Sequence, residues 1–257
     1  SDQSENNFIY YVLGKKERHT LADYVTGVEE TSTNKIVLYS SAQTGKTTEL
    51  KQLCWELQQS GLYLPVSFEV RTNTKLKRDD LPESQYVDGR EVVLVIDALD
   101  EVNGQKYEDL LEEIGGYAYE HPEMKMVLSC RSNFRRERQL ELFTELFLEE
   151  LSIDDARDYA AKREVNSDRF MRSVFANQLE DFIKNPFFLS VLIDAYKGKG
   201  KQLPKTKADI YKLFIKSSYD KEVKEKNVSL SAQHSFEESV RLLERVALGL
   251  SLMNAQS

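Results

Sequence analysis

The residues best suited to chemistry form one short run that contains a glycine, Ser41-Ala42-Gln43-Thr44-Gly45-Lys46-Thr47-Thr48. Such a run, between a strand and a helix, is typical of a phosphate-binding loop. Backbone N–H groups and the helix N-terminus then contact the phosphates, while the lysine reaches the outer ones. We therefore expect Lys46 to contact phosphate and the Thr47 hydroxyl to bind Mg²⁺.

The run departs from the usual pattern G-x-x-x-x-G-K-[ST] at its first glycine, where Ser40 stands. Serine carries a Cβ atom and enters conformations with φ > 0 less readily than glycine does. We expect this departure to affect the rate of nucleotide turnover more than nucleotide binding. An ordinary strand-to-helix turn is the alternative interpretation.

Acidic residues follow the most apolar run of the chain, Val92–Ile96. Asp97 ends that run, where a carboxylate would support the Mg²⁺ held by Thr47. Asp100 and Glu101 come three and four residues later. Either acid could orient an attacking water or accept its proton.

A single arginine follows the next apolar run, Met124–Cys130. Arg131 could neutralise or sense a γ-phosphate from this position. It also belongs to a basic cluster with Arg135, Arg136 and Arg138, so the alternative is a solvated face or a contact with a polyanion.

Strands and helices alternate in the first half of the chain, which predicts a parallel sheet covered on both faces. Because ligands of such sheets bind at the carboxyl ends of the strands, the loop, Asp97 and Arg131 should converge on one edge. The predicted strands are Ile36–Tyr39, Tyr63–Val70, Val92–Ile96, Met124–Cys130 and Phe147–Leu148. The predicted helices run from about Lys46 to Gly61 and from Tyr107 to Tyr119, and the polar segment Arg71–Arg90 reads as an exposed helix or loop.

The second half of the chain predicts helices only. Ser152 is a good helix N-cap because acids follow it, and Asn185-Pro186 separates two helical patterns. An apolar helix is predicted over Phe187–Tyr196, and amphipathic helices are predicted over Lys207–Tyr219 and His234–Met253, with a charged connector at Lys221–Lys226.

The composition indicates a globular protein. The chain has 257 residues, a formal net charge of −8, 40% hydrophobic and 30% charged residues. The negative net charge argues against a protein whose whole surface binds nucleic acid. Contact with nucleic acid through a local basic patch is possible but not expected. No apolar stretch or leader pattern predicts a membrane segment or secretion, and Cys54 and Cys130 read as reduced core cysteines. We expect a cytoplasmic protein without a zinc site.

Four motifs together resemble the NACHT-type NTPases of the STAND class of signalling ATPases. The region of resemblance is roughly Lys35–Phe214. Its most specific parts are the Asn-Pro helix and the Walker B run, in which a small residue follows the first aspartate and an acidic pair follows one apolar residue. The motifs are a Walker A run at Ser41–Leu50, a Walker B run at Val95–Glu101, a sensor 1 strand at Leu128–Arg131, and a helical-domain signature at Asn185–Leu189 with Leu203-Pro204 and the helix Asp209–Phe214.

The resemblance implies an α/β P-loop NTPase fold, with a parallel sheet flanked by helices, followed by an all-α helical domain. Pro186 would then lie against the adenine, and by the family pattern Asp100 rather than Glu101 would act on the water. The implied organisation is a lead-in over 1–33, a nucleotide-binding domain over 34–150, a helical domain over 151–226 and the start of a truncated winged-helix or second helical region over 227–257.

The function that the resemblance implies is a molecular switch that binds ATP or ADP with Mg²⁺ and hydrolyses ATP slowly. ATP would drive homo-oligomerisation in a signalling or antiviral-defence protein whose sensor and effector domains lie outside this chain. The alternatives are a mechanical AAA+-like ATPase acting on nucleic acid or protein, and an interaction platform that binds no nucleotide.

Overall fold

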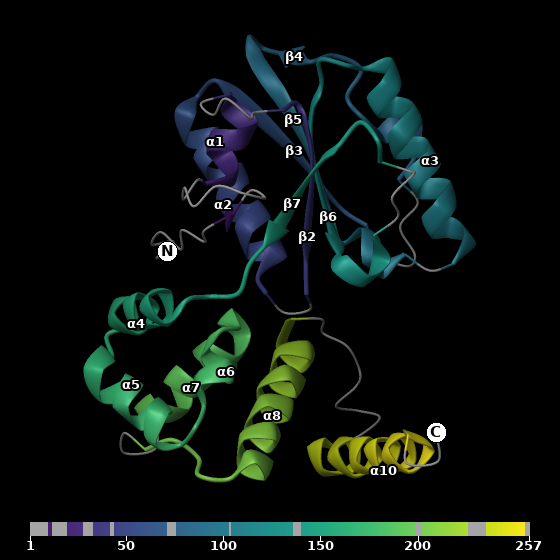
Figure 1. The fold of residues 1–257 in the computed structure, drawn as a ribbon. Helices are drawn as coiled ribbons and strands as arrows, with labels where there is room; N and C mark the ends of the chain where they lie inside the picture. Colours follow the sequence, from purple (N-terminus) through teal and green to yellow (C-terminus); the bar gives the residue numbers. More distant parts are fainter. Residues whose placement is uncertain are drawn as a thin grey trace. The chain divides into compact units, whose positions relative to one another are not determined.

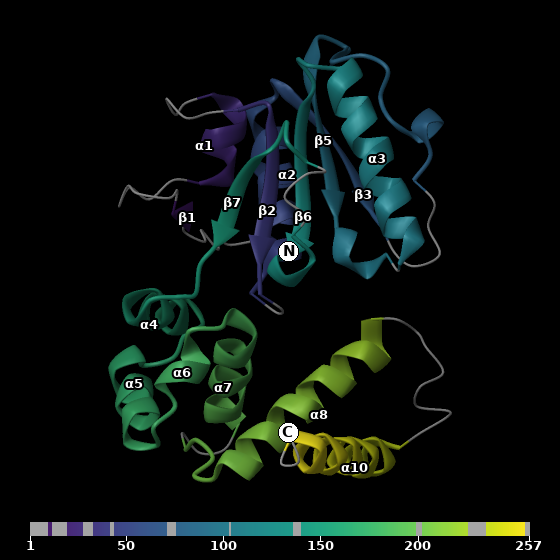
Figure 2. The same cartoon turned by 45° about the vertical axis from the view of Figure 1, so that its right-hand side comes forward.

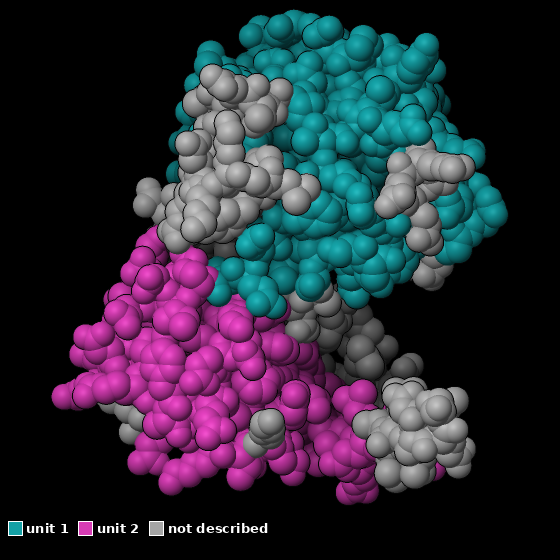
Figure 3. All heavy atoms as spheres, viewed as in Figure 1, with its two compact units in different colours: residues 1–151 teal, residues 152–257 magenta. Residues whose placement is uncertain are grey.

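The computed structural model divides the chain into two compact units, residues 1–151 and 152–257 (Figure 3). Each unit is described by itself. The structure describes residues 10–11, 20–27, 33–41, 44–70, 76–102, 104–135, 140–198, 202–225 and 235–254.

A twisted sheet forms the centre of the first unit. Its order is β1-β7-β2-β6-β5-β3, with β4 paired to β5. The five strands from β7 to β3 run parallel, which confirms the predicted parallel sheet, whereas β1 and β4 pair antiparallel. The strands are β1 (Tyr10–Tyr11), β2 (Lys35–Ser40), β3 (Tyr63–Glu69), β4 (Tyr86–Val87), β5 (Arg90–Asp97), β6 (Lys125–Arg131) and β7 (Thr144–Leu148).

Helices cover both faces of this sheet, as Figures 1 and 2 show. Along β2, Ile36 and Leu38 pack with α1 and α2, while Val37 and Tyr39 pack with α3. Because both faces are buried, β2 needs an unbroken apolar run rather than an alternating one. The helices are α1 (Leu21–Thr26), α2 (Lys46–Ser60) and α3 (Gln105–Glu120), with short 3₁₀ turns η1 (Arg78–Asp80), η2 (Leu99–Glu101) and η3 (Ser132–Phe134).

Two parts of the first unit differ from the sequence prediction. The polar segment before β5 contains β4, which turns back through Asp88-Gly89, both with positive φ. The predicted lead-in contributes α1, which begins at a capping box between Thr20 and Asp23 and ends at Gly27. Both elements carry local signals, an Asp-Gly turn and a capping box, that the apolar periodicity does not reveal.

The second unit contains only helices among its described residues, as predicted. Ser152 caps the first of them in a capping box with Asp155, and α7 begins at Pro186. The predicted connector Lys221–Lys226 is wrong over most of its length, because α8 continues through Glu225. The helices are α4 (Ile153–Lys162), α5 (Ser167–Ala176), α6 (Glu180–Ile183), α7 (Pro186–Gly198), α8 (Lys207–Glu225) and α10 (Phe236–Asn254).

An aromatic cluster joins three helices of this unit. Phe182 of α6 contacts Phe188 of α7 and both Tyr211 and Phe214 of α8, with ring centroids 5.3–5.9 Å apart. Phe188 and Phe214 stack at 4.4 Å. Such contacts stabilise the packing beyond the area that the rings bury.

The helix α10 matches the predicted C-terminal helix, and three of its large apolar residues are exposed. Leu242, Leu243 and Val246 are 58%, 49% and 52% exposed. None of the described helices has the length and apolar content needed to cross a membrane.

Candidate functional site

Three sheet positions bring the predicted site residues to one edge. In the parallel register Ser40, the last residue of β2, lies opposite Arg131, the last residue of β6. On the other side of β6 runs β5, which ends at Asp97. The loop after β2, the end of β5 and the end of β6 therefore meet at the carboxyl edge of the sheet.

The helix α2 begins directly after the glycine loop, with its N-terminus uncapped. Gly45 adopts a left-handed conformation at the N-cap, with φ of 98°, and no side chain caps the helix among the described residues. Thr47 and Thr48 in the first turn are exposed. The exposed N-terminus of this fifteen-residue helix suits an anion, because the first N–H groups of a helix have no intrahelical partner. Ala42 and Gln43 lie outside the described residues.

The loop lysine is held by Ser40. Lys46 Nζ donates to Ser40 Oγ at 3.0 Å, and Thr44 Oγ1 donates to the same oxygen at 2.6 Å. Ser40 Oγ in turn donates to the Ser41 carbonyl at 2.9 Å. Ser40 has the extended backbone of β2, so the expected difficulty with φ > 0 does not arise at this position. The serine adds a hydrogen-bonding group to the loop and costs no backbone strain.

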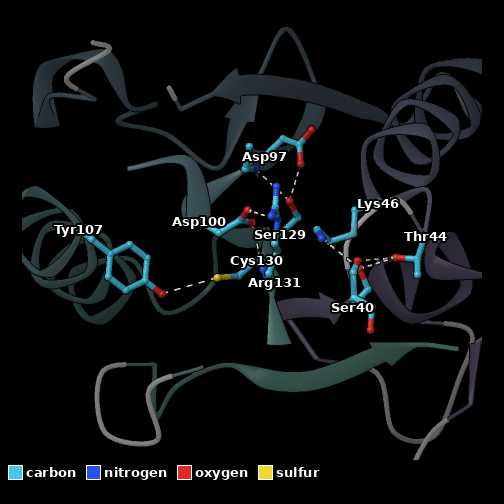
Figure 4. Close-up of polar contacts among 11 residues, drawn as sticks. Ser40, Thr44, Lys46, Asp97, Asp100, Tyr107, Ser129, Cys130 and Arg131 are labelled. Atoms are coloured by element: carbon cyan, nitrogen blue, oxygen red, sulfur yellow. Dashed lines mark hydrogen bonds and ion pairs between the residues drawn. The ribbon is translucent and has the colours of Figure 1, made fainter. Parts of the chain in front are cut away.

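Lys46 lies within an arrangement of opposite charges (Figure 4). Burial lowers the pKa of its ammonium, and the nearby Arg131 guanidinium lowers it too, while Asp100 and Asp97 act in the opposite direction. Two cationic and two carboxylate side chains from α2, β5, η2 and β6 are thus close enough to influence one another. Their formal charges cancel, so a phosphate group entering here would require a further cation.

Asp97 is positioned by the neighbouring strand. Ser129 of β6 donates its hydroxyl proton to Asp97 Oδ1 and accepts the backbone N–H of Ala98 at 3.0 Å. Ala98 takes a left-handed conformation with φ of 65°, which turns the chain sharply after β5. Ser129 is fully buried and was not among the predicted site residues. Its signal in the sequence is a hydroxyl inside an apolar strand, since a buried polar group needs a partner.

The donor set at this edge fits Mg²⁺. Among the described residues, Asp97 Oδ2 accepts no hydrogen bond, and Thr47 presents a hydroxyl at the start of α2. Carboxylate and hydroxyl oxygens are hard ligands. Within the described part of the chain, no three His, Cys, Asp or Glu side chains gather as a metal cage. One or two protein oxygens alone suit Mg²⁺, which keeps waters and phosphate oxygens as its other ligands.

Asp100 and Arg131 form an ion pair at the same edge. Arg131 Nε lies 2.7 Å from Asp100 Oδ2, and the Arg131 backbone N–H donates to Asp100 Oδ1 at 3.0 Å. The Asp100 side chain is 4% exposed, whereas that of Arg131 is 46% exposed. Glu101, the other predicted acid, ends η2 and is exposed.

Of the other arginines in the predicted basic cluster, the structure describes Arg135. Arg135 pairs with Glu145 of β7 at 2.7 Å, and Arg136 and Arg138 lie outside the described residues. Cys130 is buried and contacts the Tyr107 hydroxyl, and both Cys130 and Cys54 are free. Burial raises the pKa of each of these two thiols.

Pro186 belongs to the second unit. It opens α7, and Asn185 Oδ1 accepts the backbone N–H groups of Phe187 and Phe188 at 3.0 and 3.4 Å. This cap explains why a helix begins at the Asn-Pro pair. The contact of Pro186 with adenine stays a prediction.

Comparison with known proteins adds no family to this description: no protein-family model matches the chain, and no curated protein matches it significantly.

Proposed function

We propose that this chain is a nucleotide switch of the NACHT type, a P-loop NTPase of the STAND class that binds ATP or ADP with Mg²⁺ and hydrolyses ATP slowly. One observation carries the proposal. Lys46, at the uncapped N-terminus of a fifteen-residue helix, lies near Asp97 and Arg131, which end adjacent parallel strands, and near Asp100 of η2. A phosphate chain with a divalent cation matches that set of groups.

The roles follow from the chemistry of each side chain. Lys46 would exchange Ser40 for oxygens of the β- and γ-phosphates, and the first N–H groups of α2 would bind the remaining phosphate oxygens. Thr47 and Asp97 would hold Mg²⁺, which when bound offsets the charge of the phosphates. Arg131 would contact the γ-phosphate. An acid of the Asp100-Glu101 pair would orient the attacking water.

A switch needs two states with different affinities for ATP and ADP. The group that distinguishes the two nucleotides is the γ-phosphate, for which Arg131 is the exposed cation at the end of β6. We propose that the ATP-bound form associates with further copies of the chain. Sensor and effector functions would belong to other domains, and Pro186 of the second unit would contact the adenine.

Calorimetric titration with ADP and ATP, with and without Mg²⁺, tests the proposal. Wild-type protein should bind both nucleotides, and chelation of Mg²⁺ should weaken ATP binding. Lys46→Ala should weaken binding on the order of a hundredfold, because a charge-assisted hydrogen bond to phosphate is lost. Lys51→Ala is the matched control, since Lys51 is an exposed lysine of the same helix, and it should bind normally. Absence of binding by wild-type protein at millimolar nucleotide would refute the proposal.

A further inference from the structure

The ion pair between Asp100 and Arg131 has an unusual geometry. Both oxygens of the carboxylate contact the same residue: Oδ1 accepts the backbone N–H, and Oδ2 lies 2.7 Å from Nε of the side chain. The arginine is thereby held at two points along its length. Such a double contact restricts the side chain to few rotamers, because moving Nε away would leave the buried carboxylate of Asp100 without its ion-pair partner.

The contact uses only one edge of the guanidinium. Asp100 takes the Nε edge, and no contact to either Nη group occurs among the described residues. The Arg131 side chain is 46% exposed, while Asp100 is almost entirely buried. The remaining edge carries the two Nη groups, whose N–H donors can bind two oxygens of a phosphate.

We propose that Asp100 is a positioning residue that fixes Arg131 for a γ-phosphate, and is not the acid that acts on water. The inference rests on the proposed function and refines it. A carboxylate whose side chain is 4% exposed and whose two oxygens both contact an arginine is poorly placed to hold a water or take its proton. Discrimination of ATP from ADP then depends on Asp100 through Arg131.

The test measures affinity rather than turnover. Binding of ADP and of a non-hydrolysable ATP analogue, each with Mg²⁺, is compared in four proteins: wild type, Asp100→Asn, Arg131→Ala and the double variant. Arg131→Ala should weaken analogue binding on the order of tenfold relative to ADP. Asp100→Asn keeps the size of the side chain and removes its charge. It should lower the ratio of analogue affinity to ADP affinity by about threefold or more. This ratio should be no lower in the double variant than in Arg131→Ala alone, since Asp100 acts through the arginine.

Two other outcomes overturn the inference. If Asp100 acts on water, Asp100→Asn leaves the ratio unchanged and only slows hydrolysis. If Asp100 instead competes with phosphate for Arg131, its removal raises analogue affinity. Glu145→Gln is the matched control, because it removes the carboxylate of another arginine pair in the same unit and should alter neither affinity.

A measurement on wild-type protein guards against misfolding of the variant. The NMR signal of Arg131 Nε–H should be protected from exchange without nucleotide and should stay protected when ADP or the analogue is added. Loss of protection with the analogue would show that the pair opens, and would overturn the inference. If wild-type protein binds neither nucleotide, the proposed function fails and the inference with it. If wild type binds both and the ratio is unchanged in Asp100→Asn, the inference alone fails.

Discussion

Ser129 on β6 donates a hydrogen bond to Asp97 on β5 and accepts one from the backbone N–H of the next residue, Ala98. One buried hydroxyl therefore fixes both the carboxylate at the strand end and the turn that follows it. The two residues are 32 positions apart in the chain.

Ser129→Ala should remove both interactions. The Ala98 N–H would lose its partner in a buried site, so we expect the free energy of unfolding to fall by about 1–3 kcal/mol, measured by urea denaturation. Asp97 would also lose its donor, and Mg²⁺-dependent nucleotide binding should weaken. Ser129→Thr, which keeps the hydroxyl, should recover most of the Mg²⁺ dependence. Ser67→Ala, at an exposed position of β3, should change neither property. Normal Mg²⁺ dependence in Ser129→Ala would contradict this role.

Ser40→Gly restores the usual glycine of the phosphate-binding loop. Lys46 would then lack its hydrogen bond to the Ser40 hydroxyl, and no such bond would have to break before Lys46 binds phosphate. The affinity for ADP, measured by calorimetry, should therefore rise on the order of threefold. Stability should fall by about 1 kcal/mol, because glycine in a strand is more flexible when unfolded. Ser67→Gly, the same change in another strand of the sheet, should lower stability without raising affinity. Weaker ADP binding by Ser40→Gly would show instead that the hydroxyl supports binding.

Ala98→Gly should stabilise the protein. Ala98 has φ of 65°, a conformation that costs a residue with a Cβ about 1 kcal/mol and costs glycine little. We expect an increase of up to about 1 kcal/mol in the free energy of unfolding, offset in part by the greater flexibility of glycine in the unfolded chain. Ala118→Gly within α3 provides the contrast and should destabilise by about 1 kcal/mol. Equal destabilisation by both variants would mean that the turn at Ala98 carries no strain.

The buried carboxyl of Glu49 should make the stability of the protein depend on pH. This residue of α2 is 4% exposed, its Oε2 has no hydrogen-bond partner, and burial together with the nearby Glu56 raises its pKa from 4.5 to about 8. A carboxyl whose pKa is raised on folding contributes stability that is fully present below pH 4.5 and is lost as the pH rises through about 8.

Glu49→Gln removes the titrating group and keeps its shape. Its denaturation curves between pH 5 and 9 should lack the decline seen in wild type, and at pH 8.5 it should be more stable than wild type on the order of 2 kcal/mol. Glu56→Gln removes the neighbouring charge and should shift the decline of wild type to lower pH. A wild-type stability that is flat across this range would contradict the raised pKa of Glu49.

Much of the central sheet is predictable because its signals are local. The runs around Val37, Leu94 and Val127 are apolar on both faces, as strands covered on both sides must be. The periodicity of α2 and the glycine at its end are equally local. The antiparallel β4, the helix α1 and the length of α8 escaped prediction, since polar segments carry no apolar period and need turn or cap signals instead.

Local sequence signals are enough to place Ser40, Asp97 and Arg131 at the ends of parallel strands, because the apolar runs mark where each strand stops. The partners of these residues became visible in the folded chain alone: Ser129 with Asp97, Arg131 with Asp100 and Lys46 with Ser40. Two of these contacts join residues more than 30 positions apart, and such residues meet through the register of neighbouring strands. Whether Asp100 faces a water or an arginine is set by that register and not by its place in a motif.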